Sequence, residues 1–202
     1  MFKIGFDLDN TIVNCFKSFK KVSFKNLQDK NICDLKSREK LRNYIRVNFH
    51  DKIWTEIQSE VYGPKYYLCP PFKNCIEVLK RLSLNKNYQI YIISHKTSKD
   101  SANKGYNLQN FAKSWILDNI FRNKIKINLD DIYLCESQAE KIKHIFDLKL
   151  DCFIDDLKEI YDKILNEVPL PILYSDSFIE SKINLKVAKN WLEIERIINE
   201  FL

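Results

Sequence analysis

The chain has 202 residues, 45% of them hydrophobic, which is enough for one packed domain or for a domain with a small insertion. Its net charge of +6 is spread over interspersed Lys, Asp and Glu residues, which favours a solvated surface over a nucleic-acid partner and suits a small anionic substrate. The chain has only three glycines, which excludes Gly-rich phosphate loops. No apolar stretch reaches the roughly 20 residues that a membrane span needs. The six cysteines contain no CxxC pair, which predicts reduced thiols in a cytoplasmic protein.

The chain opens with a short apolar strand, expected over residues 2–6, that runs into two carboxylates. Asp7 and Asp9 stand at alternate positions, and Thr11 adds a hydroxyl two residues further on. On extended backbone the two carboxylates share one face, where like charges need a cation or a proton to lie close together. Read alone, this stretch fits either a functional pair or a strand that ends in an Asx turn.

Residues 14–69 differ from the rest of the chain, because apolar residues recur there at helical spacing and none alternates as in a strand. The segment ends at Gly63-Pro64 and again at Pro70-Pro71, where no regular element continues. We therefore expect a small helical unit at residues 14–69, inserted into a core made of residues 1–13 and 70–202. Its expected helix faces are Phe16, Phe19, Val22 and Phe24, then Leu41, Tyr44 and Ile45, then Ile53, Trp54, Ile57 and Val61.

From Phe72 onward, expected helices and strands alternate. The strands are expected over residues 88–93, 132–135, 152–154 and 171–174. The helices are expected over residues 72–82, 108–120, 138–146, 157–165 and 187–202. This order predicts an α/β fold of three Rossmann-like layers, in which helices cover both faces of a mostly parallel sheet.

Polar side chains close three of these strands. Because the carboxyl ends of parallel strands lie at one edge of the sheet, we expect Asp7, Ser94 and Asp155 to converge there. Lys141 joins them from the first turn of a helix. Oxygen donors without His or Cys favour a hard cation such as Mg2+. Two carboxylates ~4 Å apart repel by ~4 kcal/mol at an effective dielectric near 20, so this cation and Lys141 are both needed.

These motifs resemble those of the haloacid dehalogenase superfamily. Phe6-Asp7-Leu8-Asp9-Asn10-Thr11 resembles the first motif of that family, and Ser94 after an apolar strand resembles the second. Lys141 resembles the third motif, and Asp155-Asp156 the fourth. The four stand in the family's order and cover the chain from residue 2 to about 160. The helical insert behind the first motif resembles the small cap of many of these enzymes.

The resemblance implies a catalytic role for two residues. Asp7 would be the nucleophile that attacks phosphorus and forms an aspartyl-phosphate. Asp9 would protonate the leaving oxygen and then deprotonate the hydrolytic water, for which its pKa must be raised in the closed site. Because the dehalogenase branch lacks an acid at the position of Asp9, phosphate ester hydrolysis is expected.

The resemblance also implies the binding groups. Ser94 and Lys141 would hold the phosphoryl oxygens, and Thr11 belongs to the same phosphate site, where it would brace the turn. Mg2+ would be bound by Asp7, the carbonyl of Asp9, Asp155 and Asp156.

Several residues admit a second interpretation. Lys143 could replace Lys141, although the place of Lys141 in the first turn of its helix favours Lys141. Asp156 could cap the following helix instead of binding metal. His95 could contact substrate, or it could be structural or solvent-exposed, and His144 is expected at the surface.

Two further groups are read as structural. The aromatic residues of the insert are expected to form its core rather than a binding platform, and lysines in the loop after Ser94 are expected to be solvated. These are Phe16, Phe19, Tyr44, Trp54, Tyr66 and Tyr67 in the insert, and Lys96, Lys99 and Lys104 in the loop.

The sequence therefore predicts an Mg2+-dependent phosphatase that acts on a small phosphorylated metabolite, either a sugar phosphate or a nucleoside monophosphate. The alternative is a catalytically weak binding or regulatory module that senses a phosphorylated ligand. Processing of nucleic-acid ends is supported only by net charge. No membrane partner is expected, and the oligomeric state stays open.

Overall fold

The computed structural model describes residues 1–175 and 185–202, and the chain divides into two compact units. The sheet unit consists of residues 1–13, 71–95 and 117–202. The helical unit consists of residues 14–70 and 96–116, so it includes a segment beyond the insert expected at 14–69. We propose that the sheet unit contains the catalytic core and the helical unit the cap.

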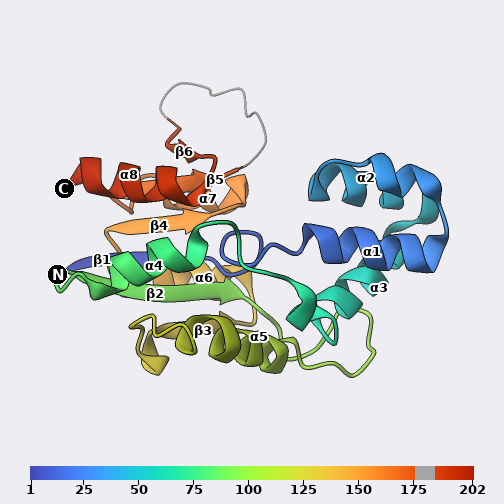
Figure 1. Ribbon diagram of the computed structural model, residues 1–202, viewed down its shortest axis with the longest axis horizontal. Coiled ribbons are helices and arrows are strands. Elements are labelled where there is room, and N and C mark those ends of the chain that lie inside the picture. The colour runs from blue at the N-terminus through green and yellow to red at the C-terminus, as the bar shows by residue number, and fades with distance from the viewer. Residues whose placement is uncertain (176–184) are drawn as a thin grey trace. The chain divides into compact units, whose positions relative to one another are not determined.

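The sheet unit is built on six parallel strands in the order β3-β2-β1-β4-β5-β6 (Figure 1). The strands are β1 (Phe2–Phe6), β2 (Tyr88–His95), β3 (Ile132–Cys135), β4 (Cys152–Asp155), β5 (Leu170–Tyr174) and β6 (Val187–Ala188). Helices cover both faces of this sheet, as the alternation of strands and helices predicts. The expected Rossmann-like α/β fold is thus confirmed.

One expected element is wrong at the end of the chain, where a helix was expected from residue 187. Val187–Ala188 instead forms the short strand β6, which pairs with β5. The helix begins only at Trp191, because Asn190 stays extended and its side chain accepts the backbone N–H of Glu193 as an N-cap. The sheet therefore has six strands where the sequence predicted five.

Four helices cover the sheet: α4 (Cys75–Leu84), α6 (Gln138–Asp147), α7 (Lys158–Ile164) and α8 (Trp191–Phe201). Helix α4 packs against α8, and α6 packs against α7. The buried face of α4 consists of Cys75, Val78, Leu79 and Leu82, so Phe72 precedes the helix that it was expected to begin. A 3-10 turn at Leu129–Asp131 and a π-helical turn at Leu117–Phe121 complete this unit. Among the described residues, no helix has the length and apolar character needed to cross a membrane.

The period of two along β1 separates the two faces of the sheet. Phe6 stacks on Trp191 of α8 at a centroid distance of 5.3 Å. Gly5 points to the other face, where a Cβ atom would lie 2.6 Å from Leu150 Cδ1 and 2.7 Å from Phe153 Cδ2. Only glycine therefore fits at this position without a shift of its neighbours. Asp7, two residues after Gly5, leaves the strand on the same side.

The helical unit contains α1 (Phe16–Leu27), α2 (Arg38–Phe49), α3 (Asp51–Tyr62) and α5 (Leu108–Ile116), with 3-10 turns at Lys30–Asp34 and Tyr66–Leu68. The three helices expected in the insert are confirmed. Phe19 stacks on Trp54 at 5.0 Å, and Tyr66 is buried, as expected of core residues. Tyr67 is 73% exposed, so its expected place in the core is wrong.

The expectation of a solvated Lys96 is also wrong. Its side chain lies in the helical unit and is only 2% exposed. The ammonium lies 4.1 Å from the ring centroid of Tyr62 and 4.3 Å from that of Tyr66. Aromatic faces thus replace much of the water around this charge.

Candidate active site

The strand ends bring two carboxylates together at one edge of the sheet unit. In the parallel register, Phe6 of β1 lies beside Ile92 of β2 and Ile154 of β4. Asp7 and Asp155 each follow one residue later, and both are buried. The structure therefore brings together Asp7 and Asp155, two of the three residues that were expected to meet at this edge.

Lys141 projects from α6 between these carboxylates. Its Nζ atom donates to Oδ1 of Asp7 and to Oδ2 of Asp155, both at 2.6 Å. The side chain of Lys141 is 2% exposed, whereas that of Lys143 is 74% exposed and pairs with Asp147 at 3.0 Å on the helix surface. The structure therefore brings Lys141 to the carboxylates and leaves Lys143 outside the site.

The electrostatics of this cluster favour a cation. The pKa of Asp7 is raised to about 7, mainly by burial; the charge of Lys141 opposes this shift, and the charges of Asp155 and Asp9 add to it. Burial acts against the charge of Lys141, yet the two neighbouring carboxylates outweigh it and raise the pKa of the ammonium above its ordinary value. Asp7 and Asp155 thus share the ammonium of Lys141, so a second positive charge would stabilise the ionised form of Asp7.

The oxygen atoms fit a hard divalent ion. Carboxylate oxygens of Asp7, Asp155 and Asp156 lie within 4.8 Å of one another. Octahedral Mg2+ with bonds of about 2.1 Å places its ligand oxygens roughly 3–4 Å apart, so small side-chain movements would complete the set. Asp155 is held in place because its Oδ1 accepts the backbone N–H of Leu157 at 2.8 Å.

Asp156 directly precedes the N-terminal end of helix α7 (Lys158–Ile164). Helix α7 has Leu157 as its N-cap, without a side-chain capping bond, and the carboxylate that accepts the N–H of Leu157 belongs to Asp155. Asp156 is left half-buried next to the other two carboxylates. Among the described residues, the side chain of Asp9 does not belong to this group.

Thr11 lies in the turn behind the first motif. It is fully buried, and its backbone carbonyl accepts Nε1–H of Trp191 at 3.0 Å. Asn10 adopts a φ of 60°, and its N–H donates to the carbonyl of Val13 at 2.8 Å. Among the described residues, no partner reaches the enclosed Oγ1 of Thr11. The contact between this turn and Trp191 is therefore made by the backbone carbonyl of Thr11 and not by its hydroxyl.

Ser94 and His95 close β2. Ser94 is buried, two residues beyond the position level with Phe6, whereas His95 is exposed. Ser94 therefore stands at the edge where the carboxylates meet, and the exposure of His95 matches the solvent-exposed alternative.

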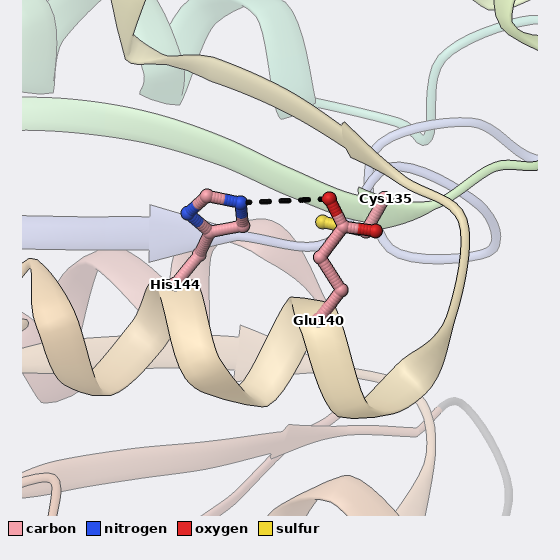
Figure 2. Close-up of side chains that lie close together, drawn as sticks. All are labelled: Cys135, Glu140 and His144. Carbon is pink, nitrogen blue, oxygen red and sulfur yellow. Dashed lines mark ion pairs between the residues drawn. The ribbon is translucent and has the colours of Figure 1, made fainter.

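The sequence did not reveal a second group of ligand-type side chains on the sheet unit. Cys135 ends β3, and Glu140 and His144 lie one turn apart on α6; one ligand atom of each lies within 4.8 Å of the others (Figure 2). His144 is half-buried, so its expected surface position is only partly met. The spacing of Glu140 and His144 could have indicated the pair, but the fold was needed to bring Cys135 beside them.

Comparison with known proteins gives structural matches alone. No family model matches the sequence, and no curated protein matches it. A haloacid dehalogenase-like family hydrolase from Streptococcus pneumoniae is 18% identical, with a TM-score of 0.58 over 100% of this chain and 99% of that chain.

Two further matches carry different chemistry. D,D-heptose 1,7-bisphosphate phosphatase from B. bronchiseptica, complexed with magnesium and phosphate, is 10% identical, with a TM-score of 0.56 over 100% of both chains. L-2-haloacid dehalogenase from Xanthobacter autotrophicus is 7% identical, with a TM-score of 0.60 over 100% of both chains. At such identities the likeness concerns the fold. The chain therefore has the fold of haloacid dehalogenase superfamily hydrolases, the family that its motifs resemble.

Proposed function

We propose that this protein is an Mg2+-dependent phosphatase that hydrolyses a small phosphomonoester through an aspartyl-phosphate on Asp7. The observation that carries the proposal is the buried ammonium of Lys141, which contacts Asp7 and Asp155 at 2.6 Å where two parallel strands end. A buried cation between carboxylates at this edge suits the binding of a phosphoryl group and the stabilisation of its developing charge.

The reaction has two steps. In the first, a carboxylate oxygen of Asp7 forms a bond to phosphorus while the ester P–O bond breaks, and Asp9 gives its proton to the leaving oxygen. In the second, water attacks phosphorus, the bond to Asp7 breaks, and Asp9 takes the proton of the water. Asp9 thus returns to its starting state when inorganic phosphate is released.

The remaining residues hold charge in place. Ser94 and Lys141 donate to the phosphoryl oxygens, and Thr11 braces the turn that aims Asp7. Mg2+ would be held by Asp7, the carbonyl of Asp9, Asp155 and Asp156. When bound, it would offset the repulsion between these carboxylates and the anionic substrate.

Asp9 favours phosphatase over dehalogenase chemistry. Expulsion of an alkoxide requires a proton, whereas expulsion of a halide does not. A carboxyl group two residues after the nucleophile is placed to supply that proton. With the helical insert at residues 14–69 proposed as a small cap, the proposed substrate is a compact phosphomonoester such as a sugar phosphate or a nucleoside monophosphate.

The assignment of Asp7 can be tested with an aryl phosphate and Mg2+. We expect Asp7→Asn to lower kcat by at least ~10³-fold, because an amide is not a nucleophile. Asp147→Asn is the matched control, since Asp147 is exposed and pairs with Lys143 at the surface of α6. Undiminished turnover by Asp7→Asn would refute the nucleophile. Stabilisation by phosphorylated ligands without any turnover would instead favour a binding module.

The role of Asp9 can be tested by the choice of leaving group. Asp9→Asn should lower kcat far more for an alkyl phosphate than for a nitrophenyl phosphate, whose leaving oxygen needs no proton. We expect the ratio of the two losses to be about tenfold or more. Equal losses for both substrates would show that Asp9 does not act as the acid, and turnover of 2-haloacids alone would replace the proposal by dehalogenation.

A further inference from the structure

A thiol, a carboxylate and an imidazole converge on the sheet unit, outside the carboxylate cluster. Cys135 is the last residue of β3, and Glu140 and His144 share one face of α6 because they stand four residues apart. We propose that these three side chains form a second metal site, which takes a borderline-soft divalent cation such as Zn2+.

The distances suit such an ion. The three ligand atoms lie within 4.8 Å of one another, and Oε1 of Glu140 lies 3.8 Å from Nε2 of His144. Tetrahedral Zn2+ with bonds of about 2.0 Å to nitrogen or oxygen and about 2.3 Å to sulfur places its ligand atoms roughly 3.3–3.6 Å apart. Small side-chain rotations would therefore close the site. Figure 2 shows the three polar groups turned toward one another.

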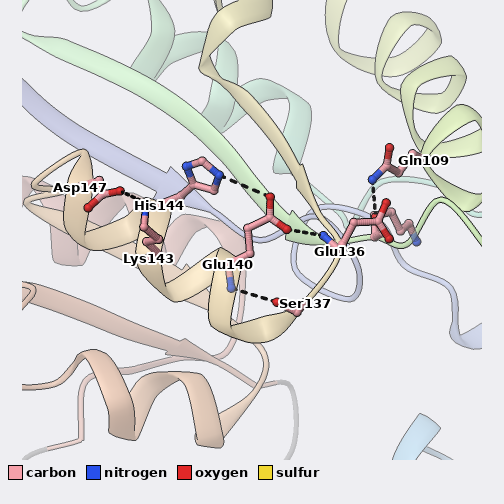
Figure 3. A network of polar contacts seen from close by, with 8 residues as sticks. Gln109, Glu136, Ser137, Glu140, Lys143, His144 and Asp147 are labelled. Atoms are coloured by element: carbon pink, nitrogen blue, oxygen red, sulfur yellow. Dashed lines mark hydrogen bonds and ion pairs between the residues drawn. The ribbon is translucent and has the colours of Figure 1, made fainter.

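Neighbouring groups already orient two of the ligands. Oε2 of Glu140 accepts the backbone N–H of Glu136 at 2.7 Å, while Oε1 of the same carboxylate faces His144 (Figure 3). The imidazole of His144 lies against the ring of Tyr133, with centroids 4.5 Å apart. Partners of this kind hold ligands in metal sites and reduce the entropy lost on binding.

The site is open to solvent on one side only. The side chains of Glu140 and His144 are 43% and 30% exposed, whereas Cys135 is 1% exposed. An ion can thus enter from the helix surface and reach a sulfur ligand at the bottom. With three protein ligands, one tetrahedral position is left for water.

Donor chemistry separates this site from the first one. Thiolate and imidazole select Zn2+ over Mg2+, whereas a set of carboxylate oxygens selects Mg2+. Burial, helped by the charge of Glu140, raises the pKa of the Cys135 thiol to about 12, so the thiol carries its proton in the metal-free protein. Binding forms the bond from metal to sulfur and releases this proton to solvent.

The full-length protein can be tested with Co2+ as a spectroscopic probe for Zn2+. Titration is carried out with excess Mg2+, which keeps the carboxylate cluster filled, and in a Cys33→Ser background, because Cys33 is an exposed thiol. We expect one Co2+ per chain, with a thiolate-to-cobalt absorption band in the near ultraviolet. Stoichiometric Zn2+ should abolish the band.

Three conservative variants locate the site. Cys135→Ser should remove the absorption band, and Glu140→Gln and His144→Gln should each weaken Zn2+ binding at least tenfold. His50→Gln is the control, since His50 is exposed in the helical unit. A band that persists in Cys135→Ser would overturn the proposal. The proposal would also be overturned if Co2+ bound without a thiolate band and this binding were lost in Asp155→Asn, because the ion would then lie in the carboxylate cluster.

Discussion

Helix α6 takes part in two clusters of opposite character. Lys141 enters a buried set of aspartate oxygens, and its ammonium already lies 2.6 Å from two of them. Glu140 and His144 lie on another face, beside the thiol of Cys135, and are partly exposed. Residues 140 and 144 share a helix face, whereas residue 141 is rotated from them by about 100°.

The contrast shows how one helix can serve two chemistries. The inner cluster combines burial with excess negative charge, so its stability depends on cations. The outer cluster combines different donor atoms and is partly exposed to solvent. The fold therefore does not depend on a cation there, although a bound cation would add to its stability. Perturbing the inner cluster should therefore have large effects, and perturbing the outer one small effects.

The largest effect is expected from Lys141→Met. It leaves Asp7 and Asp155 buried without their ammonium partner, which should lower the free energy of unfolding by about 3 kcal/mol in the absence of metal. It should also lower kcat by ~10³-fold or more, because a charge that holds the phosphoryl group is lost. Chemical denaturation and steady-state assays measure the two effects.

Lys143→Met is the matched control on the same helix, since its exposed pair with Asp147 contributes little. We expect a change in the free energy of unfolding below about 0.5 kcal/mol and unchanged turnover. Similar losses in both variants would mean that the position of Lys141 between the carboxylates has no special importance.

The fold could be predicted because its signals are local. Periodicity and turn residues gave each parallel strand from β1 to β5, and the order of elements then fixed the edge where Asp7 and Asp155 meet. The strand β6 escaped prediction because Val187–Ala188 is too short to alternate. Its pairing depends on β5, which is a tertiary contact.

Within the candidate site, the limits of prediction follow from geometry. The place of Lys141 in the first helical turn indicated that this lysine, and not Lys143, faces the carboxylates, but its contact with both of them depends on which sheet face α6 covers. Gly5 leaves room on this part of the sheet for the side chains of Leu150 and Phe153, and a lone glycine in a strand sequence does not indicate which residues pack against it. The group of Cys135 and His144 likewise needs the turn between β3 and α6.

Magnesium should produce the next largest effect. At a concentration of 100 times its Kd, Mg2+ should stabilise the folded protein by about 2.7 kcal/mol, because it binds the folded carboxylate cluster and not the unfolded chain. Asp155→Asn should abolish most of this shift, whereas Cys135→Ser should retain it. Thermal unfolding with and without a chelator measures the difference. Loss of the shift in Cys135→Ser alone would contradict the assignment of Mg2+ to the oxygen cluster.

The pH dependence of stability should come third in size. The pKa of Asp7 is raised from 3.8 to about 7 in the folded protein, so between these values the folded chain binds more protons than the unfolded chain. The contribution of Asp7 therefore falls as pH rises through this window. In metal-free protein, Asp7→Asn should match the wild type near pH 4 and be more stable than the wild type at pH 8, by a margin that grows as pH rises through this window.

Denaturation curves at several pH values test this sign, with Asp147→Asn as a control that should show no such trend. Saturating Mg2+ should reverse the order at pH 8, because the ionised carboxylate then has its cation. A stability difference that is constant with pH would show that Asp7 keeps an ordinary pKa.

The smallest effect should come from the turn that supports the outer cluster. The hydroxyl of Ser137 accepts the N–H of Glu140 at 3.1 Å and caps α6, so Ser137→Ala should cost about 1 kcal/mol of stability. Ser114→Ala is the control. It removes a hydroxyl inside α5 that donates to the carbonyl of Asn110, and it should lower the free energy of unfolding by less than about 0.5 kcal/mol, as is usual for surface substitutions. Because the cap also positions the carboxylate of Glu140, Ser137→Ala should weaken Zn2+ binding several-fold and leave the Mg2+ shift intact. Equal losses for both ions would show that the start of α6 supports the two clusters as one unit rather than separately.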